Sequence, residues 1–399
     1  MADVSTKELV KYEEVSYDKP LVADVPASGK IVSSEAGPMG STLLTLSNGI
    51  KAYLLPTDHE ADKVSLKAVS FGGASLLSAE ESYLAEYANY FVSRYGLGDF
   101  SASDLTKVLA GKSVNVSTTI STNTEAVYGN CAKGDFETML QCVSLGFKGV
   151  REDADAHASS LSMIRMQLEN LEKNPDYIMQ KEITKTMYGV NPYVKDLELE
   201  DLEKLTMERC IKIYKERFSN AGDFTFFFVG DMDIEAVKPM IAQWLGSLPV
   251  TAAREKAIDR NIVPQTGKVD NTFEKEMATT KVSSWTLYSG ENKEYDRKFL
   301  TSADFLNSIL RMRYLDTIRE DEGGSYGVSS HFSASNYLRY TYNLQISFDT
   351  DPEKIDKLYP IIEREIQKIA DEGPDAAQLQ KVKDNELNTL ANMLKRNSY

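Results

Sequence analysis

The sequence predicts an α+β protein built from two similar units. Apolar residues at helical spacing, as in segments 157–173 and 296–319, predict helices. Alternating apolar residues, as in segment 64–71, predict strands. The order of a strand, a long helix, two strands and a further helix occurs first within residues 41–250 and again after residue 270. Two copies of one α+β unit, related by duplication, account for this recurrence.

Length and composition narrow the class of protein. The chain has 399 residues, of which 42% are hydrophobic and 26% charged, which is typical of a globular protein with two or three domains. Its 60 acidic and 45 basic residues give a net charge of −15, which argues against nucleic acid or anionic lipid as the main partner. No run of about 18 apolar residues predicts a membrane span, and the first residues lack the pattern of a signal peptide.

Cysteines and histidines are few and scattered. The three cysteines, Cys131, Cys142 and Cys210, do not form a disulfide framework or a zinc knuckle, and we expect them to be small buried residues. The three histidines do not occur at metal-ligand spacing. A histidine-rich zinc site within this chain is therefore excluded.

The first unit is expected to follow an extended lead-in over residues 1–40, which contains three prolines. Within Leu43–Leu55, the pair Asn48-Gly49 predicts a hairpin with a type I′ turn. A strand over 64–71 then ends at Gly72-Gly73, and a helix is expected from Ser78 to Arg94. The remaining elements are strands at 114–120 and 126–131, a helix from Asp135, helices centred on 157–173, 176–187 and 198–217, a strand at 224–230 and a helix at 234–245.

The second unit is expected after a linker over residues 251–270. It begins with a strand at 282–288 and continues with a helix over 296–319. Strands at 326–332 and 340–348 follow, and then a helix opening at Asp351. The last helical pattern, over 379–397, has no capping signal and no strand after it, so we expect a chain cut short at its C-terminus.

The junction between the long helix and the next strand carries two candidate catalytic groups. Gly323 and Gly324 are expected to allow a tight helix exit between Arg319 and Tyr326. A guanidinium and a phenol that face one region of space are suitable donors for a carbonyl oxygen that gains negative charge. The alternative is a surface arginine and a strand tyrosine in the core.

The helix over 78–94 contains an incomplete zinc-binding pattern. Two histidines at positions i and i+4, with a glutamate at position i+3, would form the inverted zinc-peptidase motif H-x-x-E-H. Here Tyr83 and Tyr87 occupy the two histidine positions, and Glu86 occupies the position of the general base. Two tyrosines at helical spacing are also common in ordinary core packing.

Several ordered motifs give the chain a family resemblance from about residue 40 to its end. They are Leu46–Ile50, Phe71–Gly73, the Tyr83–Tyr87 frame, Tyr188–Tyr193, Leu202–Thr206, Phe224–Asp231 and the pair Arg319 and Tyr326. Together they resemble the insulinase/pitrilysin family of zinc peptidases, which includes the mitochondrial processing peptidases. The resemblance implies two repeats of the processing-peptidase-like metallohydrolase fold, each with an antiparallel-rich sheet and helices packed on one face.

The resemblance also implies roles for individual residues. In this family a third zinc ligand, a glutamate, lies on a later helix, and Gln167 stands at that position here. Tyr83, Tyr87 and Gln167 are poor zinc ligands at ordinary pH, so no metal is expected in this chain and Glu86 becomes a structural carboxylate. Zinc would be held by a partner half, and Arg319 and Tyr326 would complete that active site.

The expected function is therefore that of the non-zinc half of an insulinase-like metalloendopeptidase, inactive alone, which binds extended peptides. The expected layout is a lead-in over 1–40, a first repeat over 41–250, a linker over 251–270 and a second repeat over 271–399. The lead-in resembles the connector of single-chain family members, so we expect a C-terminal half of a longer precursor that is periplasmic or exported. The alternatives are a non-catalytic scaffold subunit and a stand-alone peptide-binding module.

Overall fold

A computed structural model describes residues 19–277, 279–291, 295–321, 325 and 327–398. These residues form two compact units. The first unit comprises the chain up to Arg165 together with Leu197–Lys256, and the second comprises Met166–Asp196 together with Ala257 onward. The boundaries of these compact units differ from those of the expected repeats. Residues 166–196 were expected in the first repeat, but they belong to the second compact unit.

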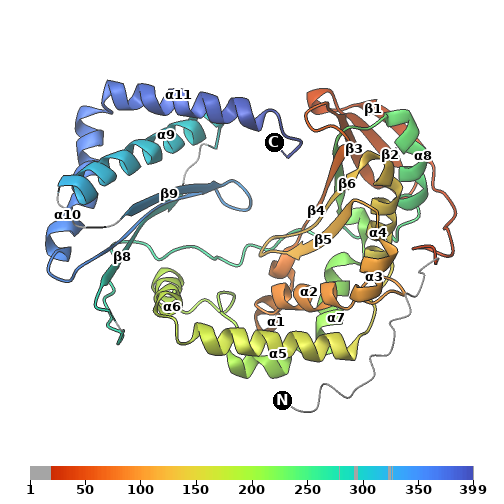
Figure 1. Cartoon of the computed structure of the whole chain (residues 1–399), viewed down its shortest axis with the longest axis horizontal. Helices are drawn as coiled ribbons and strands as arrows, with labels where there is room; N and C mark the ends of the chain where they lie inside the picture. The colour runs from red at the N-terminus through yellow and green to blue at the C-terminus, as the bar shows by residue number, and fades with distance from the viewer. Residues whose placement is uncertain (1–18, 278, 292–294, 322–324, 326, 399) are drawn as a thin grey trace, which may run out of the picture. The chain divides into compact units, whose positions relative to one another are not determined.

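The first unit contains a seven-stranded sheet, which Figure 1 shows in red, orange and green. Its strands lie in the order β1-β2-β3-β7-β4-β6-β5. Only the neighbours β3 and β7 run parallel, and all other pairs are antiparallel. The strands are β1 (Ile31–Ala36), β2 (Thr42–Leu46), β3 (Lys51–Pro56), β4 (Lys63–Phe71), β5 (Val114–Ile120), β6 (Thr124–Ala132) and β7 (Thr225–Gly230).

Helices cover one face of this sheet. Alternate residues of β4, such as Leu66 and Ala68, are buried beneath them, whereas Lys67 between these two is exposed. Figure 1 shows α2, α4, α7 and α8 on the same side of the strands. The helices of this unit are α1 (Ala79–Ser82), α2 (Ala85–Arg94), α3 (Ala102–Val108), α4 (Phe136–Lys148), the first part of α5 (Ala154–Leu171), α7 (Met207–Phe218) and α8 (Ile234–Trp244).

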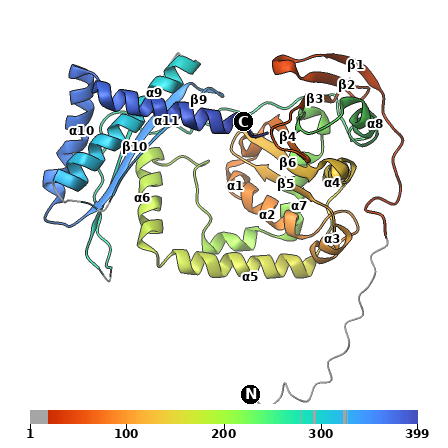
Figure 2. The ribbon, with the colours of Figure 1, turned by 45° about the horizontal axis from the view of Figure 1, so that its top comes forward.

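The second unit has a three-stranded antiparallel sheet in the order β8-β10-β9. Its strands are β8 (Val282–Glu291), β9 (Val328–Ser335) and β10 (Thr341–Thr350), and its helices are α6 (Pro175–Tyr188), α9 (Arg297–Tyr314), α10 (Ile355–Glu372) and α11 (Ala376–Met393). Figure 2 shows α9, α10 and α11 close together beside this sheet.

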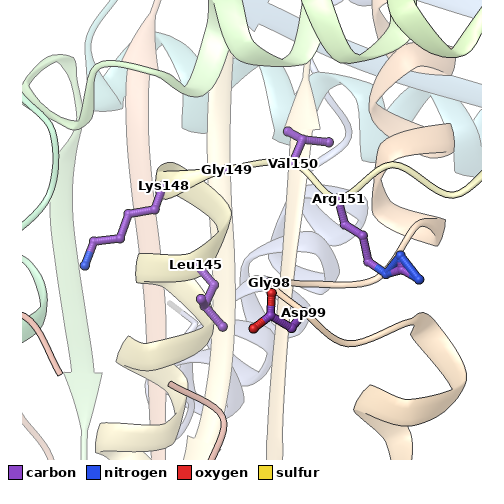
Figure 3. A pocket seen from close by; sticks show the side chains of 7 residues that line it. All are labelled: Gly98, Asp99, Leu145, Lys148, Gly149, Val150 and Arg151. Atoms are coloured by element: carbon purple, nitrogen blue, oxygen red, sulfur yellow. The ribbon is translucent and has the colours of Figure 1, made fainter. Parts of the chain in front are cut away.

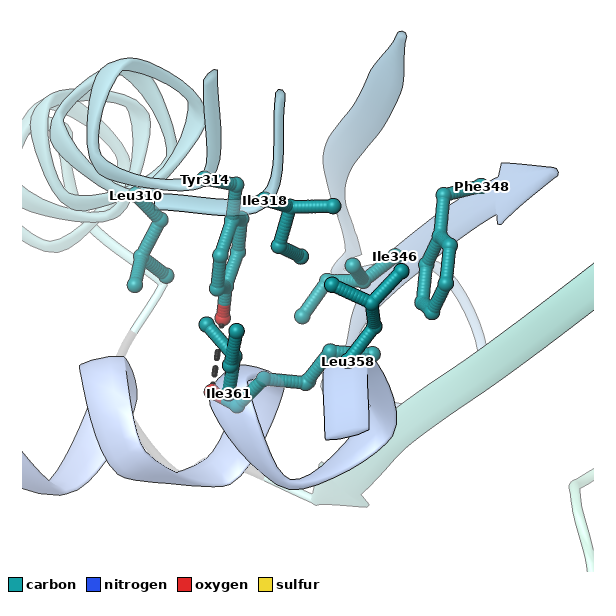
Figure 4. Close-up of a cluster of buried hydrophobic side chains, with 8 residues drawn as sticks. Leu310, Tyr314, Ile318, Ile346, Phe348, Leu358 and Ile361 are labelled. Atoms are coloured by element: carbon teal, nitrogen blue, oxygen red, sulfur yellow. Dashed lines mark hydrogen bonds between the residues drawn. The ribbon is translucent and has the colours of Figure 1, made fainter. Parts of the chain in front are cut away.

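The core of the second unit joins its helices to the sheet. Tyr314 is fully buried, and its hydroxyl donates a hydrogen bond of 2.9 Å to the carbonyl oxygen of Ile362 (Figure 4). This bond links α9 to α10. The buried side chains of the cluster are Leu310, Tyr314, Ile318, Ile346, Phe348, Leu358, Ile361 and Ile362.

The two sheets share one topology. In the first unit β4, β5 and β6 occur in that order along the chain and lie in the order β4-β6-β5. In the second unit β8, β9 and β10 lie in the equivalent order β8-β10-β9. In both units the middle strand comes last and leads into a helix, α4 or α10. The α+β class and its antiparallel-rich, repeated arrangement are therefore confirmed.

The hairpin is confirmed, but its predicted turn type is wrong. A type I′ turn requires positive φ at both central residues. Gly49 has a φ of +85°, whereas Asn48 is not among the residues with positive φ. The amide of Gly49 donates to the carbonyl of Leu46 (2.8 Å), and the amide of Leu46 donates to the carbonyl of Ile50 (2.9 Å). The connection is thus a three-residue loop that ends in a left-handed glycine.

Two predicted helices are each divided in the structure. The helix expected from Ser78 to Arg94 is interrupted at Tyr83 and Leu84, where ψ is −14° and −13° and the amide of Leu84 bonds to the carbonyl three residues earlier. The helix expected over 198–217 consists of a 3-10 turn, Leu199–Lys204, and of α7, which Thr206 caps. A helical apolar pattern does not reveal such interruptions, because neighbouring turns keep the same buried face.

Two further segments depart from or fall outside the expectations. Residues 31–36, expected within the extended lead-in, form the edge strand β1, which pairs with β2. The expected glycine exit at Gly323 and Gly324 lies outside the described residues.

Candidate functional site

Tyr83 lies at the junction of α1 and α2 and belongs to a polar cluster with Asp201 and Lys204. The Tyr83 hydroxyl donates to Oδ1 of Asp201 (2.9 Å) and accepts a hydrogen bond from Nζ of Lys204 (3.1 Å). The Lys204 ammonium also bonds to Asp201 (2.9 Å). Asp201 is only 2% exposed, and its other oxygen accepts from the amide of Glu198 (3.1 Å). We call Tyr83, Asp201 and Lys204 the Tyr83 cluster.

The Tyr83 cluster does not suit a zinc ion. Hydrogen bonds from Lys204 to Asp201 and to Tyr83 raise the pKa of the Lys204 ammonium, so it stays charged at neutral pH. An ammonium 3.1 Å from the hydroxyl repels a second cation at that position. The phenol is in addition a weak metal ligand while it keeps its proton.

The other positions of the incomplete zinc-binding pattern show no metal site. Tyr87 is half-buried on α2, and Glu86 is exposed in the first turn of that helix. Gln167 is exposed on α5 and belongs to the second compact unit. Within the described part of the chain, no three His, Cys, Asp or Glu side chains come together as a metal site would require.

Asp201 and Lys204 are site residues that the sequence did not reveal. Both lie within or beside the motif Leu202–Thr206, but their contact with Tyr83 joins positions 118 and 121 residues apart. The only local signal is a capping box, in which Glu198 and Asp201 bond to each other's backbone amides. That signal predicts the start of a helical turn and says nothing of a tyrosine partner.

Arg319 lies in an unusual helical segment. After α9 the chain continues as a wide π-helical turn over Leu315–Asp321. Ile318, next to Arg319, is fully buried in the core of the second unit, while the Arg319 side chain is exposed. π-Helical turns are rare, and they frequently occur at functional sites. Tyr326 lies outside the described residues, so its position relative to Arg319 stays a prediction.

A buried charged cluster in the first unit has a structural role. Arg217 is 6% exposed and forms a forked ion pair with Glu255 (3.0 and 3.4 Å). Glu125 is 1% exposed and accepts from the amide of Gly73. Burial raises the pKa of Glu125, although that amide, Ser70 and the charge of Arg217 act in the opposite direction. The hydrogen bond to Glu125 ties Gly73 to β6.

A depression of about 560 Å³ lies at the end of α4, lined by Gly98, Asp99, Leu145, Lys148, Gly149, Val150 and Arg151. Figure 3 shows the Lys148 and Arg151 side chains pointing to opposite sides. Arg151 is paired with Asp153 at 3.5 Å, and partial burial lowers the pKa of Lys148. Because its polar groups do not converge, the depression lacks the geometry of a catalytic site.

Histidine and cysteine side chains serve packing in the first unit. Nδ1 of His157 lies 2.8 Å from the Tyr95 hydroxyl, and burial lowers the pKa of His157. Cys131, Cys142 and Cys210 are unpaired and buried, as expected, and burial raises the pKa of Cys142 to about 11. These residues therefore offer no reactive thiolate or charged imidazole near neutral pH.

Known structures share this fold. The periplasmic protease PqqL from Escherichia coli superposes with a TM-score of 0.86 at 23% identity, over 99% of this chain and 43% of that one. The Ferredoxin Protease FusC, solved as a mutant in complex with Arabidopsis ferredoxin, gives a TM-score of 0.78 at 17% identity, over 98% of this chain and 43% of that one. The fold is thus that of the M16 peptidases.

Sequence comparison finds relatives among zinc proteases. Residues 204–386 match the Peptidase M16 inactive domain. The chain is 24% identical to the probable zinc protease PqqL of Escherichia coli over 96% of its length, and 22% identical to a PQQL-like zinc protease of Arabidopsis thaliana over 98%. The chain is thus homologous to PqqL-type zinc proteases, and residues 204–386 resemble the inactive domain of the insulinase-like M16 peptidases.

The chain covers only part of these relatives. It spans 41% of the Escherichia coli protein and 40% of the Arabidopsis protein. A separate structure of the first half of PqqL also shares the fold, with a TM-score of 0.63 and 14% identity over 90% of this chain and 79% of that one. Among the helices that the structure describes, none is both long and apolar enough to cross a membrane.

Proposed function

We propose that this chain is the non-zinc half of an insulinase-like metalloendopeptidase, and that it binds extended peptides beside a zinc held by a partner half. The observation that carries the proposal is a match over nearly the whole of this chain but only 41% of a zinc protease. The Tyr83 cluster supports it, because a lysine ammonium takes the place that a metal ion would need. The first half of PqqL has the same fold, which makes a partner of similar architecture a reasonable counterpart.

In this proposal Arg319 and Tyr326 act on the substrate carbonyl. Tyr326 donates a hydrogen bond to the oxygen that gains negative charge, and Arg319 orients the carbonyl or the phenol. Arg319 suits this role because it is exposed on a wide helical turn whose neighbour Ile318 is fixed in the core. A side chain on an anchored turn is held in place before the substrate arrives.

The edge strand β9 supplies a means of binding the peptide. β9 is an outer strand of its sheet and begins at Val328, two residues after Tyr326. An extended peptide that adds to this edge by main-chain hydrogen bonds would pass close to the start of the strand. Peptide binding at β9 would therefore bring a carbonyl group towards Tyr326.

The test is reconstitution of peptidase activity with the zinc-bearing half, followed with a fluorogenic peptide. Tyr326→Phe removes one hydrogen-bond donor and is expected to lower kcat on the order of 100-fold with little change in KM. Arg319→Lys keeps the positive charge but removes the planar guanidinium group and its paired N–H donors, so it should lower kcat as well. Tyr340→Phe is the matched control, because Tyr340 is an exposed tyrosine of the same unit, beyond the end of β9.

A rate that Tyr326→Phe leaves unchanged would contradict the catalytic role and favour a scaffold subunit. Activity of the isolated chain with stoichiometric zinc would contradict the proposal altogether.

PqqL from Escherichia coli is described as a periplasmic protease, so we also propose that this chain functions in the periplasm as part of an exported precursor. Fractionation of cells that produce the complete protein tests that placement.

A further inference from the structure

The open face of the seven-stranded sheet carries an aromatic row that the proposed catalytic role does not use. Strand pairing aligns six residues across the sheet in one line: Leu43, Tyr53, Phe227, Lys67, Tyr128 and Ser117. They come from β2, β3, β7, β4, β6 and β5, and their strand neighbours on either side point to the helix-covered face. We call this line the aromatic row.

Contacts within the aromatic row arrange the rings side by side. Tyr53 and Phe227 are stacked, with ring centroids 5.2 Å apart and planes 7° from parallel. The Lys67 ammonium lies 5.8 Å from the centroid of the Tyr128 ring. With about 4.8 Å between neighbouring strands, the row extends over about 24 Å. This length accommodates an extended peptide of about seven residues.

Side chains beside the aromatic row extend its apolar character. Val69, Leu55 and Val229 lie on the same face, in the lines next to the row. Phe71 is 45% exposed and Tyr128 is 41% exposed. Large apolar side chains that gather on one face and remain in contact with water are typical of interaction surfaces.

The charge of this face differs from that of the whole chain. The chain has a net charge of −15, yet the face displays Lys51 and Lys67, both exposed. Among the described residues of the seven strands, one carboxylate lies on this face: Glu35 of β1, which is exposed and pairs with Leu43 at the outer end of the row, whereas Glu125 of β6 points to the buried face. A ligand with carboxylates would therefore meet opposite charges at Lys67 and Lys51, and a like charge at the β1 end of the row.

We propose that the aromatic row binds extended polypeptide segments that carry aromatic or aliphatic side chains together with carboxylates. Aromatic side chains of the ligand pack on Tyr53, Phe227 and Tyr128, and its carboxylates pair with Lys67 and Lys51. A segment with both kinds of side chain suits the surface, because Lys67 lies between Phe227 and Tyr128 in the row. This inference rests on the proposed function, in that it names the class of peptide which that function would select.

Fluorescence anisotropy with the full chain tests the inference. The probes are three fluorescein-labelled octapeptides of four repeats each: Phe-Glu, Phe-Lys and Ser-Glu. We expect the Phe-Glu peptide to bind more tightly than either of the others. Lys67→Glu should weaken its binding about tenfold and improve binding of the Phe-Lys peptide. Tyr128→Ser should weaken both Phe-containing peptides.

The matched control is Lys215→Glu, which makes the same charge change at an exposed position on α7, a helix of the covered side. Equal loss of binding in Lys215→Glu and Lys67→Glu, or equal affinity for the Phe-Glu and Phe-Lys peptides, would overturn the inference. Self-association that Tyr128→Ser abolishes, without peptide binding, would show that a second copy occupies the face and would also overturn it.

The outcome is separable from that of the proposed function. If the Phe-Glu peptide does not bind while Tyr326→Phe still slows the reconstituted peptidase, the aromatic row is not a peptide surface and the catalytic role stands. If the peptide binds as expected while Tyr326→Phe has no effect on turnover, the surface stands and the catalytic role fails.

Discussion

The Tyr83 cluster allows a quantitative prediction for Tyr83→Phe. The substitution removes only the hydroxyl, and with it a 2.9 Å hydrogen bond to the buried Asp201. A hydrogen bond to a charged group contributes about 1.5–3 kcal/mol to stability. Asp201 keeps its bonds from Lys204 and from the amide of Glu198, so we expect the lower end, a loss of about 1.5 kcal/mol.

The chain offers a simple assay for this change. It has two tryptophans, Trp244 in the first unit and Trp285 in the second. Trp244 is fully buried, so in a Trp285→Phe background its fluorescence reports the unfolding of the first unit alone. With a urea dependence of about 2.5 kcal/mol per molar, the midpoint should fall by about 0.6 M in Tyr83→Phe.

Tyr90→Phe serves as the matched control for Tyr83→Phe. The Tyr90 hydroxyl donates only to the thioether of Met163 at 3.3 Å, and this bond is exposed. A thioether is a weak acceptor, so the control should lose less than about 0.5 kcal/mol. A midpoint for Tyr83→Phe that equals the control or the parent would refute the reasoning, because the buried carboxylate would then not depend on the phenol.

Two further predictions concern the segment around Gly73. Because burial raises the pKa of Glu125 above its usual 4.5, the folded state binds its proton more tightly, and this contribution to stability is lost as the pH rises through the folded pKa. In urea titrations the stability of Glu125→Gln should therefore increase relative to that of the parent as the pH rises above 4.5, and a difference that stays constant with pH would argue against the raised pKa. Gly73 has a φ of +58°, and an added Cβ would clash with the backbone at Ser121, whereas Gly111 at +79° faces open space. Gly111→Ala should cost about 1 kcal/mol and Gly73→Ala clearly more, and equal urea midpoints for the two would contradict the clash.

Much of the fold could be predicted from the sequence because its signals are local. β5 and β7 lie within one residue of the expected segments, and α10 and α11 start within a few residues of theirs. The repeat order also holds, because it depends only on the succession of strands and helices. The missed features, such as the junction at Tyr83 and the turn at Asn48, depend on partners far away in the chain. Asn48, for instance, donates to the carbonyl of Leu245 at 2.9 Å.

The candidate site was predictable in part. The pattern of Tyr83, Glu86 and Tyr87 indicated that the zinc-binding motif is incomplete, because the residue types alone exclude ordinary metal ligands. The sequence did not reveal that Lys204 and Asp201 engage the Tyr83 hydroxyl, because this contact depends on how a distant 3-10 turn packs. The pairing of Arg319 with Tyr326 stays a prediction, since Tyr326 lies outside the described residues.

The sequence by itself determined the α+β class, the repeated order of elements and the resemblance to insulinase-like peptidases, since hydrophobic periodicity and spaced motifs are properties of neighbouring residues. Only the tertiary structure decided which side chains meet. It placed a lysine ammonium against Tyr83, put Arg319 on a wide helical turn and aligned Tyr53, Phe227 and Tyr128 across one face of a sheet. Such contacts depend on strand register and helix packing, which join segments that no local pattern connects.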